Sequence, residues 1–275
     1  MPIIQIDLDP ERIGIRCQVS VGLIGDAKIT LAQLSKELIK KDIRKFLDEA
    51  QKTHVTAIEK LNHAAKQKNK EIQSPLLTDT ISRYLSDDAI VTVDAGTVSV
   101  WANNWLRLNG KQRLIGTTEL GTLGFGLPAG MGCQLAMPDR QVVVLCGDGG
   151  FHMTMADFAT AVKYDLPMVI IIYNNFSYHF IELEQLKEGV PICYTKLTNP
   201  SYAKFAEAHG AVGYTVTDAT QLESTIKEAM SLKKLCIVDV HVKKDELIKP
   251  NEVTLSLISH FAMGMLKTKW AEWTR

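Results

Sequence analysis

Two apolar segments of the sequence end in residues that could hold a metal ion and a phosphate. One segment, "VVVLC" (142–146), is followed by Gly147-Asp148-Gly149-Gly150, and the other, "MVIIIY" (168–173), is followed by Asn174-Asn175. Glycines after a strand let the backbone approach a ligand closely, and the N-terminus of the next helix favours a phosphate. A carboxylate would repel that phosphate unless a hard divalent cation lay between them, as Mg²⁺ commonly does. The pattern therefore predicts a magnesium and diphosphate site.

The protein ligands of this cation would all be oxygen atoms. Asp148 offers a carboxylate, Asn175 a side-chain carbonyl from the next strand end, and Ser177 a backbone carbonyl just beyond it. Diphosphate oxygens and water would complete the octahedron that Mg²⁺ prefers. The alternative is that the glycines form a plain tight turn and the asparagines begin an exposed loop. The helix and buried strand predicted between the two motifs favour the metal site.

Alternating strands and helices would position these residues. From residue 71 onward, continuously apolar runs alternate with helix-like segments. That order is typical of an α/β fold with a doubly wound parallel sheet and helices on both faces. Ligands of such folds bind at the carboxyl ends of the strands, where Asp148 and Asn175 fall. The predicted strands are 89–94, 113–117, 141–146, 168–173, 213–217 and 235–242, and the predicted helices are 97–108, 124–137, 153–165, 200–209 and 219–231.

The N-terminal part of the sequence differs from the rest. "PIIQIDLDP" (2–10) is similar to the last strand of a domain whose earlier part is absent, although an ordinary first strand fits the composition equally well. Residues 31–70 have one apolar stripe at helical spacing and many lysines, which predicts a solvated linker helix. A basic binding patch is the alternative, but acidic residues are interspersed and no aromatics alternate with the lysines. We expect the remnant of an earlier domain at 1–35, a helical linker at 36–72 and the domain with the predicted diphosphate site at 73–275.

The composition excludes several classes of protein. The chain has 275 residues, with 31 basic and 31 acidic side chains, so no net charge attracts nucleic acid. Its five cysteines form no CxxC pair, which argues against a disulfide framework or a zinc site and favours a reducing cytoplasm. The longest apolar runs are too short to span a bilayer. We therefore expect a cytoplasmic globular protein that binds no nucleic acid.

The spacing of the GDG and NN motifs resembles the signature of thiamin-diphosphate-dependent enzymes. The chain is similar to the C-terminal half of the 2-oxo acid enzymes of the acetolactate synthase and pyruvate oxidase type. The resemblance implies that residues 1–35 are the C-terminal remnant of a Rossmann-like, flavin-type central domain and that residues 73–275 are the diphosphate-binding domain. Three segments resemble pyruvate oxidase and quinone-linked pyruvate dehydrogenase more than acetolactate synthase. They are "DAGTVSVWANNWLRLNGKQRLIG" (94–116), "IELEQLKEG" (181–189) and "KKDELIKPNEVTLSLISHFAMGML" (243–266).

The resemblance implies roles for particular residues. Asp148, Asn175 and the Ser177 carbonyl match the magnesium ligands. Leu123 matches the bulky apolar side chain that holds thiamin diphosphate in a bent conformation, and Asp7 matches a strand-end residue that contacts a flavin nucleotide. A plain exposed aspartate is the alternative for Asp7. The other cofactor-binding candidates are Gly121, Thr122, Gly147, Gly149, Gly150, Tyr178, His179 and Ile181.

Two further residues match family positions close to the reaction. Phe180 corresponds to an aromatic side chain between thiamin and flavin, and Glu184 corresponds to an acidic residue near the substrate. Tyr178-His179 stands where relatives often have a small residue, which leaves the shape of the substrate side open. His179 could donate a proton, although a packing or surface histidine is the favoured alternative.

As an activity, the resemblance implies oxidative decarboxylation of pyruvate, or of another small 2-oxo acid, with thiamin diphosphate, Mg²⁺ and FAD. The alternatives are an acetolactate synthase-type carboligase and a non-catalytic diphosphate-binding module. The family's activating glutamate lies in an N-terminal domain that this sequence lacks, so the chain alone would hold half a cofactor site. We expect a homo-oligomer, a separately encoded N-terminal half, or both; a remnant or an expressed fragment is also compatible with the sequence. The tail 258–275 is amphipathic, and we favour packing on the domain over contact with a membrane surface.

Overall fold

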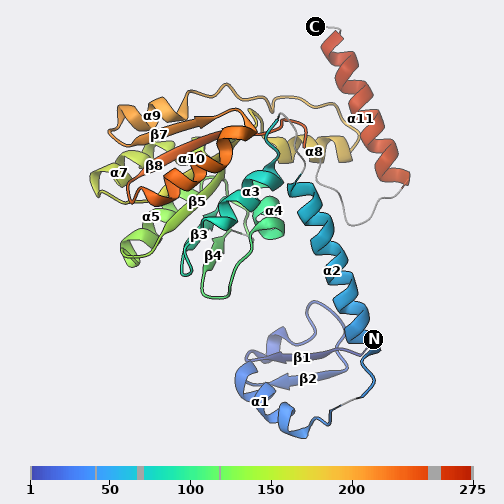
Figure 1. The fold of residues 1–275 in the computed structure, drawn as a ribbon. Helices are drawn as coiled ribbons and strands as arrows, with labels where there is room; N and C mark the ends of the chain where they lie inside the picture. The colour runs from blue at the N-terminus through green and yellow to red at the C-terminus, as the bar shows by residue number, and fades with distance from the viewer. Residues whose placement is uncertain (1, 41, 67–70, 118, 247–254, 274–275) are drawn as a thin grey trace. The chain divides into compact units, whose positions relative to one another are not determined.

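The computed structural model describes residues 2–40, 42–66, 71–117, 119–246 and 255–273, and the chain divides into two compact units (Figure 1). The first unit covers residues 1–56 and the second covers 57–275, so that the boundary falls inside helix α2 (Lys45–Ala65). Each unit is described by itself below.

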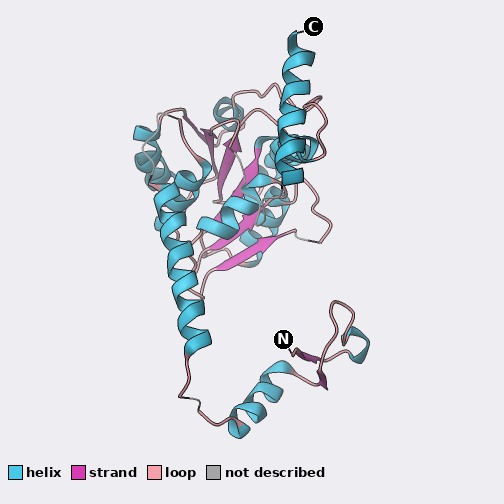
Figure 2. Cartoon of the chain, turned by 90° about the vertical axis from the view of Figure 1, so that its right-hand side faces the viewer, coloured by secondary structure: helices cyan, strands magenta, loops and turns pink. Residues whose placement is uncertain are grey.

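A six-stranded sheet forms the centre of the second unit. All of its strand pairs are parallel, and the strand order is β4-β3-β5-β6-β8-β7. Parallel strands need crossover connections, which the helices between them supply (Figure 2). The predicted α/β fold with a parallel sheet is therefore confirmed. The strands are β3 (Ile90–Val93), β4 (Arg113–Gly116), β5 (Val142–Gly147), β6 (Val169–Asn174), β7 (Val212–Val216) and β8 (Cys236–His241).

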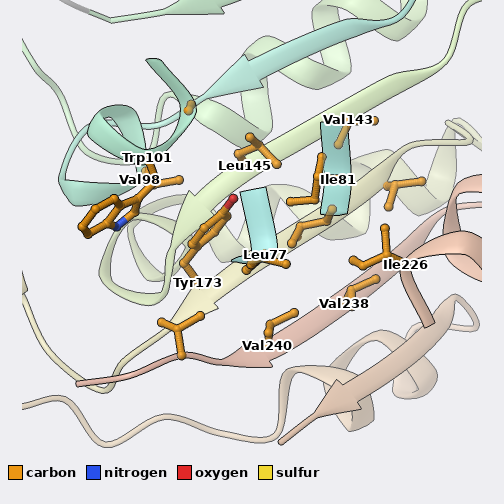
Figure 3. Packing of buried hydrophobic residues seen from close by; sticks show 14 of the residues in the cluster. Leu77, Ile81, Val98, Trp101, Val143, Leu145, Tyr173, Ile226, Val238 and Val240 are labelled. Atoms are coloured by element: carbon orange, nitrogen blue, oxygen red, sulfur yellow. The ribbon is translucent and has the colours of Figure 1, made fainter. Parts of the chain in front are cut away.

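Helices cover both faces of this sheet because successive side chains of each buried strand point to opposite sides. Val143 and Leu145 of β5 join one apolar cluster, whereas Val142, Val144 and Cys146 join the other. The first cluster includes residues of α3 (Ser74–Arg83), α4 (Thr97–Trp105) and α10 (Ala219–Ser231) and is shown in Figure 3. The second includes residues of α5 (Gly126–Ala136), α6 (Asp148–Thr154), α7 (Phe158–Lys163) and α9 (Tyr202–Ala208).

Three local features differ from the sequence-based expectations. The helix expected at 31–70 is broken, because α1 ends at Glu37 and the described residues up to α2 are not helical. No proline or glycine marks that break. The helix expected from residue 153 begins five residues earlier, at Asp148, directly after β5; the short 3₁₀ helix η2 (Met155–Asp157) joins it to α7. Two helices were not predicted, α3 and α8 (His179–Lys187).

The first unit contains a small parallel pair of strands, a short 3₁₀ helix, helix α1 and the beginning of α2. β1 (Ile4–Asp7) pairs in parallel with β2 (Val21–Ile24), and both are followed by short connections to η1 (Pro10–Arg12) and α1 (Ala27–Glu37). Neither helix buries a side chain, and apolar residues such as Ile24 remain largely exposed. The predicted domain boundaries stay a prediction, since the division inside α2 is one of compactness alone.

The last described helix, α11 (Leu255–Trp273), packs against α8. Thr268 accepts a hydrogen bond from the Ile192 backbone at its hydroxyl, and Lys267 donates to the carbonyl of Gly189 just beyond α8. Gly264 allows this close approach, because a Cβ there would lie 3.0 Å from both Leu186 Cδ2 and the Val190 carbonyl. Among the described residues, no helix has the length and apolar character needed to cross a membrane.

Candidate functional site

A large cleft opens at the carboxyl ends of the central strands. The sheet order places β3 beside β5, and the chain leaves these two neighbours in opposite directions, toward β4 and toward β6. Such a switch point is where open α/β sheets bind ligands. The cleft has a volume of about 810 Å³, within the range of cofactor sites. Its lining includes most of the sequence-predicted site residues: Gly121, Leu123, Gly147, Asp148, Gly149, Gly150, Asn175, Ser177, Tyr178, His179, Phe180, Ile181 and Glu184.

Asp148 is a buried carboxylate in the first turn of α6. It is 2% exposed; its Oδ1 accepts from the backbone of Gly149 at 3.0 Å, and its Oδ2 accepts from Asn199 Nδ2 at 2.7 Å. Burial raises the pKa of Asp148 to about 6, and the hydrogen bonds from Asn199 and the backbone oppose that rise. A carboxylate held in surroundings that disfavour its charge is a site where a cation binds favourably.

The two asparagines at the end of β6 have different partners. Asn174 donates to Asp239 Oδ1 at 2.9 Å and accepts from Asn199 at 2.8 Å, so it belongs to a buried network. Asn175 faces the cleft and is 7% exposed, and its Oδ1 accepts from the Ser177 backbone at 3.2 Å. Phe176, which lies between Asn175 and Ser177, has the left-handed φ of 62° that L-residues seldom adopt. This turn brings both Asn175 and Ser177 to the cleft that Asp148 also lines.

The oxygen atoms of Asp148, Asn175 and Ser177 are of the chemical type that Mg²⁺ prefers as ligands. One carboxylate, one amide carbonyl and one backbone carbonyl are hard ligands, and Mg²⁺ takes further oxygens from water and from a phosphate. No group of three or more His, Cys, Asp or Glu side chains suited to a metal occurs in the part of the chain that the structure describes. The donor set at the cleft is of another kind, because it combines one carboxylate with neutral oxygens.

The glycines of the GDGG motif are needed for space. Neither Gly149 nor Gly150 has a positive φ, and both lie in the first turn of α6. A Cβ on Gly149 would be 2.4 Å from the Tyr178 ring, and one on Gly150 would be 2.9 Å from Asp94 Oδ2. The absence of side chains at these two positions therefore lets Tyr178 and Asp94 pack directly against the start of α6, where both glycines also line the cleft.

Asp94 ends another of the predicted strands and also lines the cleft, although it is not among the site residues inferred from the resemblance. It follows β3, is 1% exposed, and accepts backbone hydrogen bonds from Ala95 at 2.7 Å and from Gly124 at 2.9 Å through Oδ1. Its Oδ2 accepts from the backbone of Gly126 at 3.2 Å. Burial raises the pKa of Asp94, and these backbone donors lower it. The carboxylate thereby fixes the loop before α5 to the end of β3.

That loop carries Leu123. Gly121 and Gly124 have positive φ values of 61° and 86°, conformations that favour glycine. Leu123 is 40% exposed and lines the cleft, and its contact with a cofactor stays a prediction. Thr122 is not part of the lining; its hydroxyl donates to the Leu123 carbonyl at 3.3 Å.

The start of α8 forms a further wall of the cleft. Phe180 and Ile181 are 40% and 46% exposed, and Glu184 follows them as an exposed carboxylate that also lines the cleft. These three side chains are therefore placed together, as the sequence-based assignment requires. Their exposed apolar surface is available to a ligand in the cleft.

His179 is held by partners that sequence reasoning missed. Its Nδ1 lies 3.0 Å from Glu182 Oε2, and its Nε2 lies 2.9 Å from the carbonyl of Glu246. Burial lowers the pKa of His179, but the Glu182 bond and the other partners raise it more, and the pKa of Glu182 falls to about 2. Because both ring nitrogens face acceptors, the imidazolium is the form that satisfies them. His179 thus braces the cleft wall, and both of its N–H groups are engaged.

Asp7 is not part of this cleft. It lies at the end of β1 in the first unit, and its Oδ1 accepts from the Asp9 backbone at 3.1 Å. Part of the segment 243–266, used above for the resemblance, falls at 247–254, outside the described residues.

Comparison with known proteins identifies the family. The family described as "Thiamine pyrophosphate enzyme, C-terminal TPP binding domain" matches residues 94–240, which include every proposed magnesium ligand. The chain is 37% identical to the Bacillus subtilis protein YdaP, whose name describes it as containing thiamine pyrophosphate, over 97% of this chain and 46% of that protein. It is 29% identical to the acetolactate synthase isozyme 3 large subunit of Escherichia coli, over 91% of this chain and 45% of that subunit. A large subunit of acetolactate synthase from Porphyra purpurea is 28% identical over 90% of this chain and 42% of its own length.

The chain thus spans less than half the length of these curated relatives. The family match begins directly after β3, covers β4 to β7 and all of β8 except its last residue, and includes the residues around Asp148. The chain belongs to the thiamine pyrophosphate (thiamin diphosphate) enzymes, and residues 94–240 are its C-terminal cofactor-binding domain.

Proposed function

We propose that the cleft binds the diphosphate of thiamin diphosphate through a magnesium ion. Asp148, Asn175 and the Ser177 carbonyl would hold the ion, and the start of α6 would receive the phosphate oxygens. The observation that carries this proposal is the buried Asp148 carboxylate, which lines a cleft of about 810 Å³ beside two glycines that lack room for a Cβ. A cation would remove the unfavourable burial of that charge.

The proposed reaction class is decarboxylation of a small 2-oxo acid such as pyruvate. Thiamin diphosphate supplies the electron sink for this chemistry when it is bound. Residues of this chain would orient it and keep water out: Leu123 from below, and Phe180 and Ile181 from the wall formed by α8. Glu184 would face the substrate. Because the chain spans under half of its relatives, the cofactor site would be completed by a further segment, a second copy or both.

Carboligation of the acetolactate synthase type is the outcome that the relatives favour. Two of the relatives named above are large subunits of acetolactate synthase, each aligned over at least 90% of this chain. After decarboxylation, such an enzyme joins the two-carbon fragment to a second 2-oxo acid. The sequence-based expectation of oxidation with FAD is the second candidate, favoured by the segments 94–116 and 181–189. The N-terminal strand pair that ends at Asp7 would belong to the flavin-binding part in that case.

The test begins with binding. Calorimetry of the protein purified with its natural partners should show heat of thiamin diphosphate binding only when Mg²⁺ is present, and the Asp148→Ala variant should show none. Absence of Mg²⁺-dependent binding by the wild type would refute the proposed site.

Product analysis then distinguishes the reactions. The protein purified with its natural partners should release CO₂ from pyruvate. Formation of acetolactate without dye reduction supports carboligation, whereas acetate or acetyl phosphate with dye reduction supports the oxidase. Binding without turnover in either assay would support a non-catalytic module.

A further inference from the structure

We propose that Asn199 is a positioning residue that holds the magnesium ligand Asp148 in the orientation needed to bind the ion; the inference rests on the proposed function. Asn199 lies in the segment between α8 and α9, far from both strand ends in the sequence. Its Nδ2 donates to Asp148 Oδ2 at 2.7 Å and to Asn174 Oδ1 at 2.8 Å. One side chain therefore joins the ends of β5 and β6, the two strands that carry the proposed ligands.

The orientation of the Asn199 amide follows from the rest of the network. Asp239, on β8 and 1% exposed, can only accept hydrogen bonds as a carboxylate, so Asn174 turns its NH₂ group toward Asp239 Oδ1 at 2.9 Å. The carbonyl of Asn174 then faces Asn199, which must present its own NH₂ group. A flipped Asn199 amide would place its oxygen against two other oxygens. The network thus has one consistent assignment, in which Asn199 donates both to Asp148 and to Asn174, and Asn174 donates to Asp239.

These hydrogen bonds orient the Asp148 carboxylate before a cation binds. Its Oδ2 is oriented by Asn199 and its Oδ1 by the backbone of Gly149, so the plane of the carboxylate is fixed before any ion arrives. Mg²⁺ demands a nearly ideal octahedron and is sensitive to a misplaced ligand. Partners that orient a ligating carboxylate typically change metal affinity about 10–100-fold when they are removed.

The arrangement around Asn199 is also unfavourable for the residue itself. Its Oδ1 is buried and has no hydrogen-bond partner among the described residues. A buried amide oxygen without a donor destabilises a fold. Gln134 also has a buried amide oxygen without a partner among the described residues, so the positioning role rests on the two oxygens that Asn199 Nδ2 meets, on Asp148 and on Asn174.

The test compares metal affinity with stability. Mg²⁺ binding at saturating thiamin diphosphate is measured by calorimetry for the wild type, Asn199→Ala and Asn199→Ser, and unfolding is measured in parallel. We expect the Kd for Mg²⁺ to rise about 10–100-fold in Asn199→Ala. Asn199→Ser, whose hydroxyl donates only one hydrogen bond, should show a smaller rise and provides the measurement if the alanine variant fails to fold.

A matched control separates positioning from general damage. Gln134 is another buried amide, whose Nε2 donates to the carbonyls of Met137, Pro138 and Arg140 at the end of α5 away from the cleft. Gln134→Ala should lower the unfolding temperature and leave the Kd for Mg²⁺ unchanged.

The outcomes are distinguishable. If the wild type shows no Mg²⁺-dependent binding, the proposed function itself fails. If the wild type binds and both Asn199 variants keep its Kd within about twofold while losing stability, as Gln134→Ala does, the positioning role is overturned. The loss of metal affinity in the Asn199 variants should also be larger for Mg²⁺ than for Ca²⁺, because Ca²⁺ tolerates flexible geometry. Equal losses for both ions would indicate general disruption of the cleft and would likewise overturn it.

Discussion

Replacing Asp148 by asparagine should change the pH dependence of stability in a way that depends on burial of the carboxylate. The side chain is 2% exposed, and its pKa rises from 3.8 to about 6 on folding, mainly because of that burial. A raised carboxyl pKa means that the folded state binds the proton more tightly than the unfolded state. The metal-free wild type should therefore lose stability as the pH rises from 3.8 to about 6. Below that pH range the carboxyl group is protonated in both states, and burial of its charge costs no folding free energy. Above that range it is charged in both states, and the full cost of burying the charge is present.

The magnitude follows from the width of the window. A pKa difference of about two corresponds to roughly 3 kcal/mol of folding free energy at neutral pH. Asparagine removes this penalty, but its single carbonyl oxygen cannot accept from both Gly149 and Asn199, which costs about 1 kcal/mol. Asp148→Asn should therefore be more stable than the wild type by about 2 kcal/mol near neutral pH and less stable by about 1 kcal/mol in acid. For a unit of this size the neutral-pH gain corresponds to roughly 4–8 °C in Tm.

The assay is thermal and urea denaturation in EDTA at acidic, intermediate and neutral pH. The exposed Asp165 provides a matched control, since Asp165→Asn makes the same chemical change at the surface and should shift stability by less than about 0.5 kcal/mol at every pH. Mg²⁺ with thiamin diphosphate should then stabilise the wild type and leave Asp148→Asn unchanged. If Asp148→Asn is less stable than the wild type by the same amount at all pH values, burial does not penalise the charged form and the reasoning is refuted.

Three other variants test neighbouring features. Gly150→Ala should weaken Mg²⁺-dependent thiamin diphosphate binding and destabilise the protein by about 1–3 kcal/mol, because the new Cβ would meet Asp94. Its control, Gly132→Ala in α5, has open space around the new Cβ and should stabilise the protein slightly. Calorimetry measures binding and urea titration measures stability for each variant. Asp94→Ala should leave the backbone N–H groups of Gly124 and Gly126 without their acceptor, which hydrogen exchange would detect as faster exchange in that loop; unchanged protection would contradict the role given to Asp94. Glu182→Gln should lower the pKa of His179 in an NMR titration, because the hydrogen bond and the charge of Glu182 both raise that pKa; an unchanged pKa would show that Glu182 does not stabilise the imidazolium.

The sequence predicted the site best where a polar residue directly follows a buried, apolar strand. Asp148 and Asn175 each follow an apolar run, so their approach at one edge of a parallel sheet followed from the pattern. Asp94 follows a third apolar run in the same way, but its bonds from Gly124 and Gly126 could not be predicted, because these glycines lie 30 and 32 residues further along the chain. Asn199 could not be found from this pattern, because it follows no apolar run and its partner Asp148 lies 51 residues away.

The helices were predicted less well where burial is unusual. α8 has a cleft on one side and α11 on the other, so its apolar residues do not form the single stripe expected for a surface helix. After Glu37 the prediction failed in the other way, because a helix was expected and none forms. Leucines and isoleucines continue at helical spacing there, but the described residues before α2 are not helical. α1 buries no side chain in its own unit, so tertiary packing does not reinforce that spacing.

The position of β8 in the sheet has a consequence for how the protein is made. β8 is the last strand of the described residues, yet it lies between β6 and β7 and pairs with both. During synthesis, β6 therefore keeps one unpaired, apolar edge until residues 236–241 have left the ribosome, and β7 has no strand beside it to join. Unpaired edges of this kind promote aggregation of incomplete chains. We expect nascent chains that stop before Cys236 to depend on chaperones, and the cleft to form only after this final strand is inserted.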